Sequence, residues 1–282
     1  MRGSRARSFA STSSKRPSTG AAGIELAMAT VKRSDGAAGV TAGGSADAVT
    51  VRAGGAHEHA SASQSRMRMG TRMFTLYTTP LSANGRKVLA VCRHLGLDPD
   101  VKLVNVYAGE GRTPAYLAIH PLGKIPTLVD GHLTVWESNA VLQFMVEAHG
   151  GNRLWSREAK GRAAIVRWLY WETAEWQPAL VQVLTGFVAR ELGLVDGRTP
   201  VTLNWSDARF RTQAEFLELH LRGREYLALD ELTIADFSVA AMMMYVRRAY
   251  FPFSEFPAIA AWYERIEALE AWRSTAVEPW TY

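Results

Sequence analysis

Two short segments of this 282-residue chain carry side chains that suit the recognition of a small charged peptide. Residues 123–128 read Gly-Lys-Ile-Pro-Thr-Leu, and residues 137–140 read Glu-Ser-Asn-Ala. An X-Pro bond that opens an apolar run is a common place for a cis peptide, which can offer the backbone of Ile125 to a bound peptide. The second segment puts a carboxylate and a hydroxyl at the expected start of a helix, where free N–H groups attract a carboxylate. Together the segments predict a socket for a zwitterionic peptide.

Each half of this socket also has a simpler interpretation. Most X-Pro bonds are trans, so Pro126 can mark an ordinary turn into a strand. A Glu-Ser pair before a helix, here Glu137 and Ser138, is more often a helix cap than a binding site. The socket therefore depends on both segments meeting in the fold.

A third pair, Ser82 and Asn84, lies where the first expected strand turns into the first expected helix. A hydroxyl or an amide N–H at a helix N-terminus can donate a hydrogen bond to a thiolate and lower the pKa of the thiol. Ser82 can instead be only the N-cap of that helix. No general base stands near Ser82 in the sequence, so a serine hydrolase is not indicated.

The elements that must position these residues alternate between strand and helix. Strand patterns cover residues 74–78, 102–106, 127–129 and 133–136, the last two joined by an Asp-Gly turn. Helix patterns follow Ser82, with Gly96 as the stop, then cover residues 113–119 as a short helix or turn, and begin again at Ser138. The order β-α-β-α-β-β-α predicts a small α/β unit with a mixed sheet.

The rest of the chain is expected to be helical. After a linker at residues 151–158, helix patterns cover residues 159–192, 206–223, 233–249 and 255–271. Thr233 and Asp236 are spaced as a capping box with Asp in place of Glu, which favours a role in folding rather than in chemistry. The aromatic side chains at positions 168, 170, 171 and 176 give this half aromatic surface, but helical spacing is equally typical of a core.

The first 72 residues differ in composition from everything that follows. They contain one aromatic residue, Phe9, and 11 Lys or Arg against 4 Asp or Glu, so they carry a net charge of +7 and leave −2 of the total of +5 for the remainder. Such a segment cannot bury enough apolar surface to fold. We expect a disordered extension, arising from an over-extended translation start or acting as an organellar targeting signal.

The order and spacing of these motifs resemble the cytosolic glutathione S-transferase superfamily. The resemblance covers residues 73–282 and rests on segments 82–88, 120–128, 137–140, 226–237 and 256–262. It implies a thioredoxin-like N-terminal domain at residues 73–151, with a mixed four-stranded sheet, and an all-α C-terminal domain at residues 158–282. Ser82 aligns with the serine of theta-like and phi-like members, whereas Asn84-Gly85 resembles the bacterial and fungal nu-like group.

The resemblance also implies roles for individual residues in the binding of glutathione. Pro126 matches the family's cis-proline, Ile125 the residue whose backbone pairs with the cysteinyl unit, and Lys124 a contact to the glycyl carboxylate. Glu137 and Ser138 match the site of the γ-glutamyl head group. Ser82 is the favoured donor to the thiol, with Asn84 assisting or replacing it.

The function implied is glutathione transfer, in which the bound thiolate attacks an electrophilic hydrophobic substrate, as in detoxification by a cytoplasmic homodimer. A glutathione-dependent peroxide or disulfide reductase and a non-catalytic binding protein of the same fold are the alternatives. Neither a metal, a nucleic acid nor a membrane is expected as a partner, since the sequence lacks a phosphate loop, a dinucleotide fingerprint, zinc-ligand spacing and a long apolar run. Cys92, the single cysteine, lies on an apolar helix face and is expected in the core rather than as a nucleophile.

Overall fold

The computed structural model describes residues 74–79, 81–150, 153–198 and 200–276. The predicted disordered extension, residues 1–72, lies outside these residues. The predicted domain boundaries at residues 151 and 158 stay a prediction. Within the described residues, no helix combines the length and the apolar character needed to cross a membrane.

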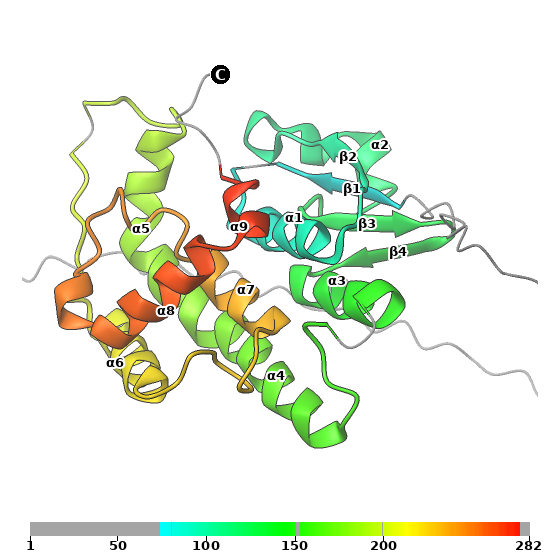
Figure 1. The fold of residues 1–282 in the computed structure, drawn as a ribbon. Coiled ribbons are helices and arrows are strands. Elements are labelled where there is room, and N and C mark those ends of the chain that lie inside the picture. The colour runs from blue at the N-terminus through cyan, green and yellow to red at the C-terminus, as the bar shows by residue number, and fades with distance from the viewer. Residues whose placement is uncertain (1–73, 80, 151–152, 199, 277–282) are drawn as a thin grey trace, which may run out of the picture. The chain divides into compact units, whose positions relative to one another are not determined.

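A four-stranded mixed sheet forms the first half of the described chain (Figure 1). Its strands are β1 (Thr75–Thr78), β2 (Asp100–Leu103), β3 (Thr127–Asp130) and β4 (Leu133–Trp136), in the spatial order β2-β1-β3-β4. β1 pairs in parallel with β2 and antiparallel with β3, and β3 pairs antiparallel with β4. This is the mixed sheet that the strand pattern predicts.

The sequence predicts the hairpin of β3 and β4 correctly but places β2 too late in the chain. The hairpin of β3 and β4 is confirmed, because Asp130 pairs with Leu133 across Gly131, which has φ 60°. The second strand was expected at residues 102–106 but ends at Leu103. The parallel register with β1, which pairs Thr75 with Asp100, shifts the strand toward the N-terminus, and a 3-10 turn follows at Val106–Ala108.

The helices of this half begin and end at the residues that the caps predict. α1 (Ala83–Leu95) has Ser82 as its N-cap and ends at Gly96, whose φ of 73° lies in the left-handed region that glycine favours. After a second 3-10 turn at Glu110–Arg112 comes the short α2 (Pro114–Leu117), and α3 (Ser138–Met145) continues into a π-helical turn at Val146–Gly150. In Figure 1, α1 and α3 lie between the sheet and the helical half.

The helical half starts with one long helix that contains a π-helical turn. α4 (Ala159–Trp171) runs through the turn at Glu172–Trp176 into α5 (Gln177–Glu191). π-helical turns leave backbone groups out of the regular pattern and often occur near functional sites. This turn faces the sheet half, since Glu172 bonds to Lys87 of α1.

The remaining helices are α6 (Ala208–Leu221), α7 (Ile234–Ala241), α8 (Pro257–Glu267) and α9 (Glu270–Arg273), with a 3-10 turn at Phe253–Glu255. The capping box of α7 is confirmed, because the carboxylate of Asp236 accepts hydrogen bonds from the backbone N–H and from the hydroxyl of Thr233. The expected helix at 233–249 is too long, since residues 242–250 form turns rather than a continuous α-helix. The single helix expected at 255–271 is two helices.

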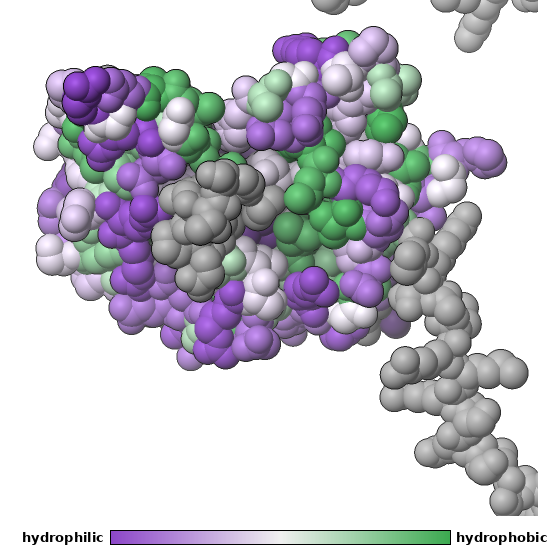
Figure 2. All heavy atoms as spheres, turned by 90° about the horizontal axis from the view of Figure 1, so that it is seen from above, coloured by the Kyte–Doolittle hydropathy of each residue, from purple (hydrophilic) through white to green (hydrophobic). Residues whose placement is uncertain are grey.

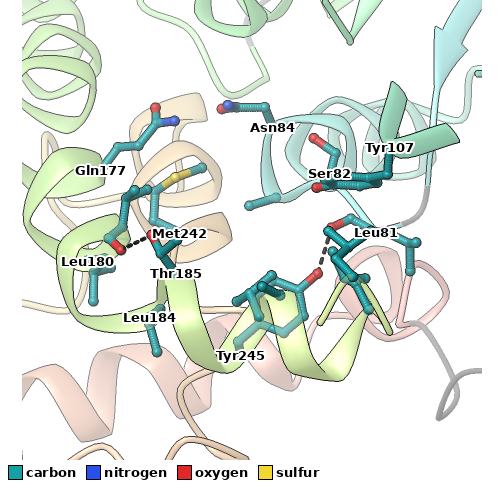
Figure 3. Close-up of a pocket in the computed structure, with 16 residues that line it drawn as sticks. Leu81, Ser82, Asn84, Tyr107, Gln177, Leu180, Leu184, Thr185, Met242 and Tyr245 are labelled. Atoms are coloured by element: carbon teal, nitrogen blue, oxygen red, sulfur yellow. Dashed lines mark hydrogen bonds between the residues drawn. The ribbon is translucent and has the colours of Figure 1, made fainter. Parts of the chain in front are cut away.

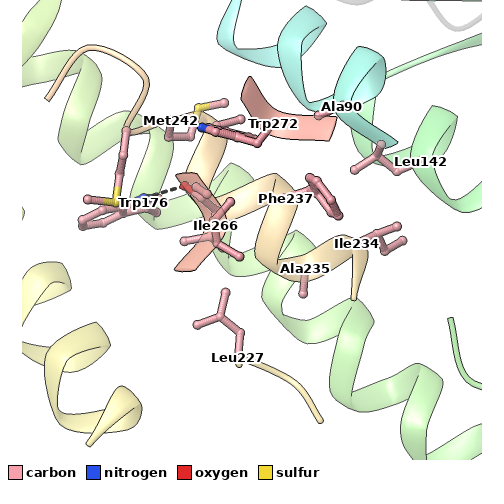
Figure 4. Packing of buried hydrophobic residues seen from close by; sticks show 14 of the residues in the cluster. Ala90, Leu142, Trp176, Leu227, Ile234, Ala235, Phe237, Met242, Ile266 and Trp272 are labelled. Atoms are coloured by element: carbon pink, nitrogen blue, oxygen red, sulfur yellow. Dashed lines mark hydrogen bonds between the residues drawn. The ribbon is translucent and has the colours of Figure 1, made fainter. Parts of the chain in front are cut away.

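One hydrophobic core joins the helices to the sheet. Phe237 of α7 and Trp272 of α9 are buried and pack toward Ala90 of α1 and Leu142 of α3 (Figure 4). Trp176 is fully buried, and its indole N–H donates to the carbonyl of Val239 over 3.3 Å. The fold is therefore a thioredoxin-like α/β unit packed against an all-helical unit, as predicted.

Candidate functional site

The turn from β1 into α1 is held in one shape by close packing. The Ser82 hydroxyl accepts a hydrogen bond from the backbone N–H of Gly85 over 3.1 Å, which caps the helix. A Cβ on Gly85 would lie 2.1 Å from the Thr78 hydroxyl, so only glycine fits there. This close approach fixes Ser82 and Asn84 at the N-terminus of α1.

Asn84 connects this turn to the second predicted segment. The hydroxyl of Ser138, at the start of α3, donates to Oδ1 of Asn84 over 3.1 Å. The contact spans 54 positions of the sequence and brings the predicted thiol-activating residue beside the predicted head-group residue. It also leaves the Asn84 amide N–H groups to donate elsewhere.

The loop before β3 holds the predicted proline in the conformation that the resemblance implies. The peptide bond between Ile125 and Pro126 is cis. Upstream, the hydroxyl of Tyr116 donates to the carbonyl of Lys124 over 2.7 Å. Gly123 has φ 62°, and a Cβ there would lie 2.1 Å from the carbonyl oxygen of Gly111. The loop is therefore fixed on the N-terminal side of the cis bond.

Glu137 has an unusual backbone for a residue with a side chain. Its φ is 68° and its ψ is 110°, which places it in the left-handed half of conformational space that costs a residue of this type about 1–3 kcal/mol. It stands as the N-cap of α3, yet its side chain makes no capping hydrogen bond. The simple-cap interpretation of Glu137 is therefore wrong, and its carboxylate remains available to a ligand.

A polar cavity of about 870 Å³ collects most of the predicted residues. Its lining includes Asn84 from α1, the loop residues Lys124, Ile125 and Pro126, and both Glu137 and Ser138. The walls thus present a cation, a carboxylate and hydroxyl and amide donors to one volume. A zwitterionic ligand can satisfy these groups together.

The helical half closes the other side of this cavity with residues that the sequence analysis did not assign to the site. They include Tyr170 near the end of α4, Thr173 within the π-helical turn and Gln177 at the start of α5. His120 also lines the cavity, and its Nδ1 accepts from the backbone N–H of Leu122 over 3.1 Å. Burial lowers the pKa of His120 below its ordinary value, with Glu137 acting in the opposite direction. No local signal separates these residues from ordinary surface positions.

A second, apolar cavity of about 320 Å³ adjoins the first (Figure 3). Ser82 lines this cavity and is absent from the lining of the polar one. Its walls are mainly aliphatic residues of α5 and the segment after it, with two tyrosines, and carry no charged side chain: Leu81, Ala83, Leu180, Leu184, Val188, Ala189, Leu192, Leu194, Met242, Tyr107 and Tyr245. Figure 2 shows green hydrophobic side chains beside a hollow between the helical and sheet halves.

The two cavities share three wall residues, Asn84, Gln177 and Val181. In Figure 3 the side chains of Asn84 and Gln177 extend toward each other across the rim of the apolar cavity. The shared wall is therefore a place where the contents of the two cavities could touch. Asn84 is part of that wall, and Ser82 lines only its apolar side.

Cys92 lies in the core, as the sequence predicts. Its side chain is 1% exposed, and burial raises the pKa of its thiol to about 12. The sulfur lies 3.9 Å from that of Met145. Cys92 is therefore protonated at neutral pH and belongs to neither cavity.

The aromatic surface expected from the helical half contributes little to the cavities. Trp168 and Trp176 are buried, and Trp171 stacks on Trp176 with ring centroids 5.6 Å apart. Only Tyr170 of the four aromatic residues at 168, 170, 171 and 176 lines either cavity. Among the described residues, no group of three or more His, Cys, Asp or Glu is arranged to hold a metal ion.

Family models match both halves of the chain. The N-terminal domain of glutathione S-transferases matches residues 76–153, and the C-terminal domain of glutathione S-transferases matches residues 206–270. The first match contains every residue predicted to touch the bound peptide. The second contains the capping box of α7.

Solved structures of similar fold are also described as glutathione transferases. Glutathione transferase F7 of Populus trichocarpa is 27% identical, with a TM-score of 0.66 over 72% of this chain and 98% of that chain. A possible glutathione S-transferase of Rhodopseudomonas palustris is 27% identical, with a TM-score of 0.61 over 73% and 100% of the two chains. A glutathione transferase homologue of Drosophila mojavensis with bound glutathione is 25% identical, with a TM-score of 0.61 over 72% and 94%.

Proposed function

Because this chain belongs to the cytosolic glutathione S-transferase superfamily, we propose that it binds glutathione in the polar cavity and transfers it to an electrophile held in the apolar cavity. The observation that carries the proposal is the shared wall of Asn84, Gln177 and Val181. Two ligands that meet at such a wall react as if in one molecule, which removes much of the entropic barrier.

The charged ends of glutathione match the charged groups of the polar cavity. The glycyl carboxylate is assigned to Lys124, and the ammonium and carboxylate of the γ-glutamyl group to Glu137 and Ser138. The backbone of Ile125, before the cis bond to Pro126, is assigned to the cysteinyl unit. This order runs from the loop before β3 to the start of α3 and leaves the thiol near Asn84, which lines the same cavity.

The thiol is activated by hydrogen-bond donors at the N-terminus of α1. The Ser82 hydroxyl uses its oxygen to accept from Gly85, which leaves its O–H free to donate to the sulfur. The Asn84 amide accepts from Ser138 and can donate its N–H as a second contact. Each pKa unit by which these donors lower the thiol pKa stabilises the thiolate by about 1.4 kcal/mol.

The reaction is an attack of the thiolate on an electrophilic carbon. The thiol proton leaves to solvent, the sulfur forms a bond to carbon, and the leaving group departs with its electron pair. The uncharged lining of the apolar cavity favours an apolar electrophile. Transfer to such compounds would serve detoxification, in the cytoplasm as the proposed location.

In the reductase alternative glutathione also binds in the polar cavity, but a peroxide or a disulfide takes the place of the electrophile in the apolar cavity. It is favoured by one observation, that Asn84 rather than Ser82 stands at the wall between the cavities. An amide at that place is the feature by which Asn84-Gly85 resembles the nu-like group. Turnover of a hydroperoxide by glutathione, with oxidised glutathione as product, would identify this activity.

We also propose a homodimer. Large apolar side chains are exposed on β4 and on α4, where Leu133 is 47% exposed, Trp136 43% and Tyr170 73%. Burial of such residues against a second copy would remove apolar surface from water. Analytical ultracentrifugation of the full chain would give a dimer, and a monomer at micromolar concentration would contradict it.

The proposed function is tested by calorimetry followed by turnover. The full chain should bind glutathione, and the Lys124→Ala variant should bind it more weakly. The bound enzyme should then conjugate a halogenated nitroaromatic faster than it reduces a hydroperoxide. Absence of glutathione binding would contradict both enzymatic functions and would favour the non-catalytic binding protein.

A further inference from the structure

Behind the polar cavity lies a charged side chain with no access to solvent. Lys87 of α1 is 0% exposed, and its ammonium group donates to Glu172 over 3.1 Å, to Asn139 over 2.9 Å and to Ser238 over 3.2 Å. Glu172 is also 0% exposed. A buried ion pair of this kind persists only where its geometry and hydrogen bonds offset the loss of hydration.

Asn139 is the residue on which this group of side chains converges. The two N–H groups of its amide nitrogen are shared among three acceptors: the carboxylate of Glu172 at 2.8 Å, the hydroxyl of Thr173 at 3.0 Å and the carbonyl of Leu169 at 3.0 Å. Its amide oxygen accepts from Lys87 and from Ser238, the latter over 2.7 Å. Every polar group of the Asn139 side chain is thereby fixed.

The same face of α1 holds two consecutive residues of α3. Asn84 and Lys87 are three positions apart in α1 and therefore lie on one side of the helix. Asn84 bonds to Ser138, and Lys87 bonds to Asn139. These two links set the position and the direction of the first turn of α3 against α1.

Glu172, the partner of Lys87 in the ion pair, belongs to the helical half, which forms the opposite wall of the polar cavity. Glu172 opens the π-helical turn between α4 and α5. Its neighbours Leu169 and Thr173 bond to Asn139 and line the polar cavity, as Asn139 itself does. One buried cluster thus joins the two walls between which a ligand at the start of α3 would lie.

We propose that Lys87 and Glu172 are positioning residues, which hold Asn139 and through it the first turn of α3 at the site of the γ-glutamyl head group. The inference rests on the proposed binding of glutathione. Neither residue touches the ligand, because neither lines the polar cavity. Their effect reaches the ligand through Asn139 and through the backbone N–H groups beside Ser138.

A purely structural role predicts a different result, and the difference can be measured. Replacement of a buried ion pair by apolar residues of similar volume is often neutral for stability. The double variant Lys87→Met/Glu172→Leu therefore retains a folded protein if the pair serves only packing. If the pair positions α3, this folded variant binds the head group poorly.

The experiment measures dissociation constants by calorimetry on the full chain, with glutathione and with cysteinylglycine, which lacks the γ-glutamyl group. For Lys87→Met/Glu172→Leu we expect the dissociation constant of glutathione to rise about tenfold, and that of cysteinylglycine to stay at the parent value. Glu218→Gln is the matched control. Glu218 is a buried carboxylate, 4% exposed, which accepts from the N–H groups of Ala258 and Ile259 and lines neither cavity.

A second variant keeps the inference testable if the double variant does not fold. Asn139→Ala retains the ion pair and removes its link to α3, so it should reproduce the tenfold loss for glutathione alone. Where all variants fold, the triple variant should lose no more than the double variant, because residues that act through one another are not additive. Additive losses would mean that Asn139 contacts the ligand independently of the pair and would overturn the inference.

The failure of this inference is distinct from the failure of the proposed function. If the parent binds glutathione and Lys87→Met/Glu172→Leu binds it equally well, the positioning role is wrong and the proposed function stands. Equal losses for glutathione and cysteinylglycine would also overturn the positioning role. A parent that binds neither ligand would overturn both.

Discussion

The two cavities differ in chemistry although they share a wall. The polar cavity is built largely by the sheet half, from a loop and two helix N-termini whose groups carry charge or donate hydrogen bonds. The apolar cavity is built largely by α5 and the segment after it, from aliphatic side chains. The difference suits the polar cavity to a ligand held by directed contacts and the apolar cavity to one selected by shape and hydrophobicity.

The largest expected effect is the loss of glutathione affinity when the carboxylate of the polar cavity is neutralised. Glu137→Gln keeps the size of the side chain and removes its negative charge, so an ammonium group loses a charge-assisted hydrogen bond. Such bonds contribute about 1.5–3 kcal/mol, which corresponds to a rise of about 10–100-fold in the dissociation constant of glutathione. Calorimetry gives this constant, and steady-state kinetics should show an unchanged KM for the electrophile.

Glu147→Gln provides the control for this prediction. Glu147 is an exposed carboxylate that follows α3 and lines neither cavity. Its replacement should leave both constants at the parent values. A change in the electrophile's KM for Glu137→Gln as large as that for glutathione would show that the cavities do not act separately.

A smaller effect is expected from a charge placed in the apolar cavity. Leu194 lines that cavity and is 48% exposed, so Leu194→Glu should fold. The added carboxylate should lower kcat/KM for an apolar electrophile by about tenfold, since a pocket contact of this size is worth about 1–3 kcal/mol. The affinity for glutathione should not change.

Leu194→Met is the matched substitution, because it alters shape but adds no charge. It should retain kcat/KM within about threefold, as volume-conserving apolar exchanges usually do. Equal losses for the Glu and Met variants would mean that charge is not what the apolar cavity excludes.

The smallest effect on binding and turnover is expected from Cys92, which lies in α1 and lines neither cavity. Burial raises the pKa of its thiol to about 12, so the unfolded chain loses this proton at a lower pH than the folded protein does. The contribution of Cys92 to stability is present below the unfolded pKa and falls as pH rises toward about 12, by up to about 1.4 kcal/mol per pH unit.

Chemical denaturation at several alkaline pH values measures this effect. The stability of the parent should fall more steeply with pH than that of Cys92→Ala, and the kinetic constants of the variant should match those of the parent. A thiol reagent should modify the folded parent only as it unfolds. Rapid modification of the folded protein would show that Cys92 is accessible.

The contrast between the cavities also explains what the sequence could predict. Several residues that line the polar cavity stand at starts of elements, where a cap, a proline or a charge departs from the local pattern, so the sequence predicts Lys124, Pro126, Glu137 and Ser138 as candidates. Leu180, Leu184 and Val188 follow the same helical spacing as core residues. Whether such a side chain faces a cavity or the core depends on packing between distant segments.

Long-range contacts account for the other differences. Lys87 resembles an exposed lysine in the sequence, yet its buried partner Glu172 lies 85 positions away. The boundary of β2 depends on its register with β1, which no local pattern contains. The helix expected at residues 233–249 ends at Ala241, and the three methionines that follow lie in turns.

The measurement that tests the central claim most directly is the thiol pKa of glutathione bound to the full chain, followed by the ultraviolet absorbance of the thiolate. The account predicts a bound pKa below that of free glutathione, raised by about one unit or more in Ser82→Ala and in Asn84→Ala, since a hydrogen bond to a charged group is worth about 1.5–3 kcal/mol. A bound thiol with the pKa of free glutathione, or one that neither substitution changes, would contradict it.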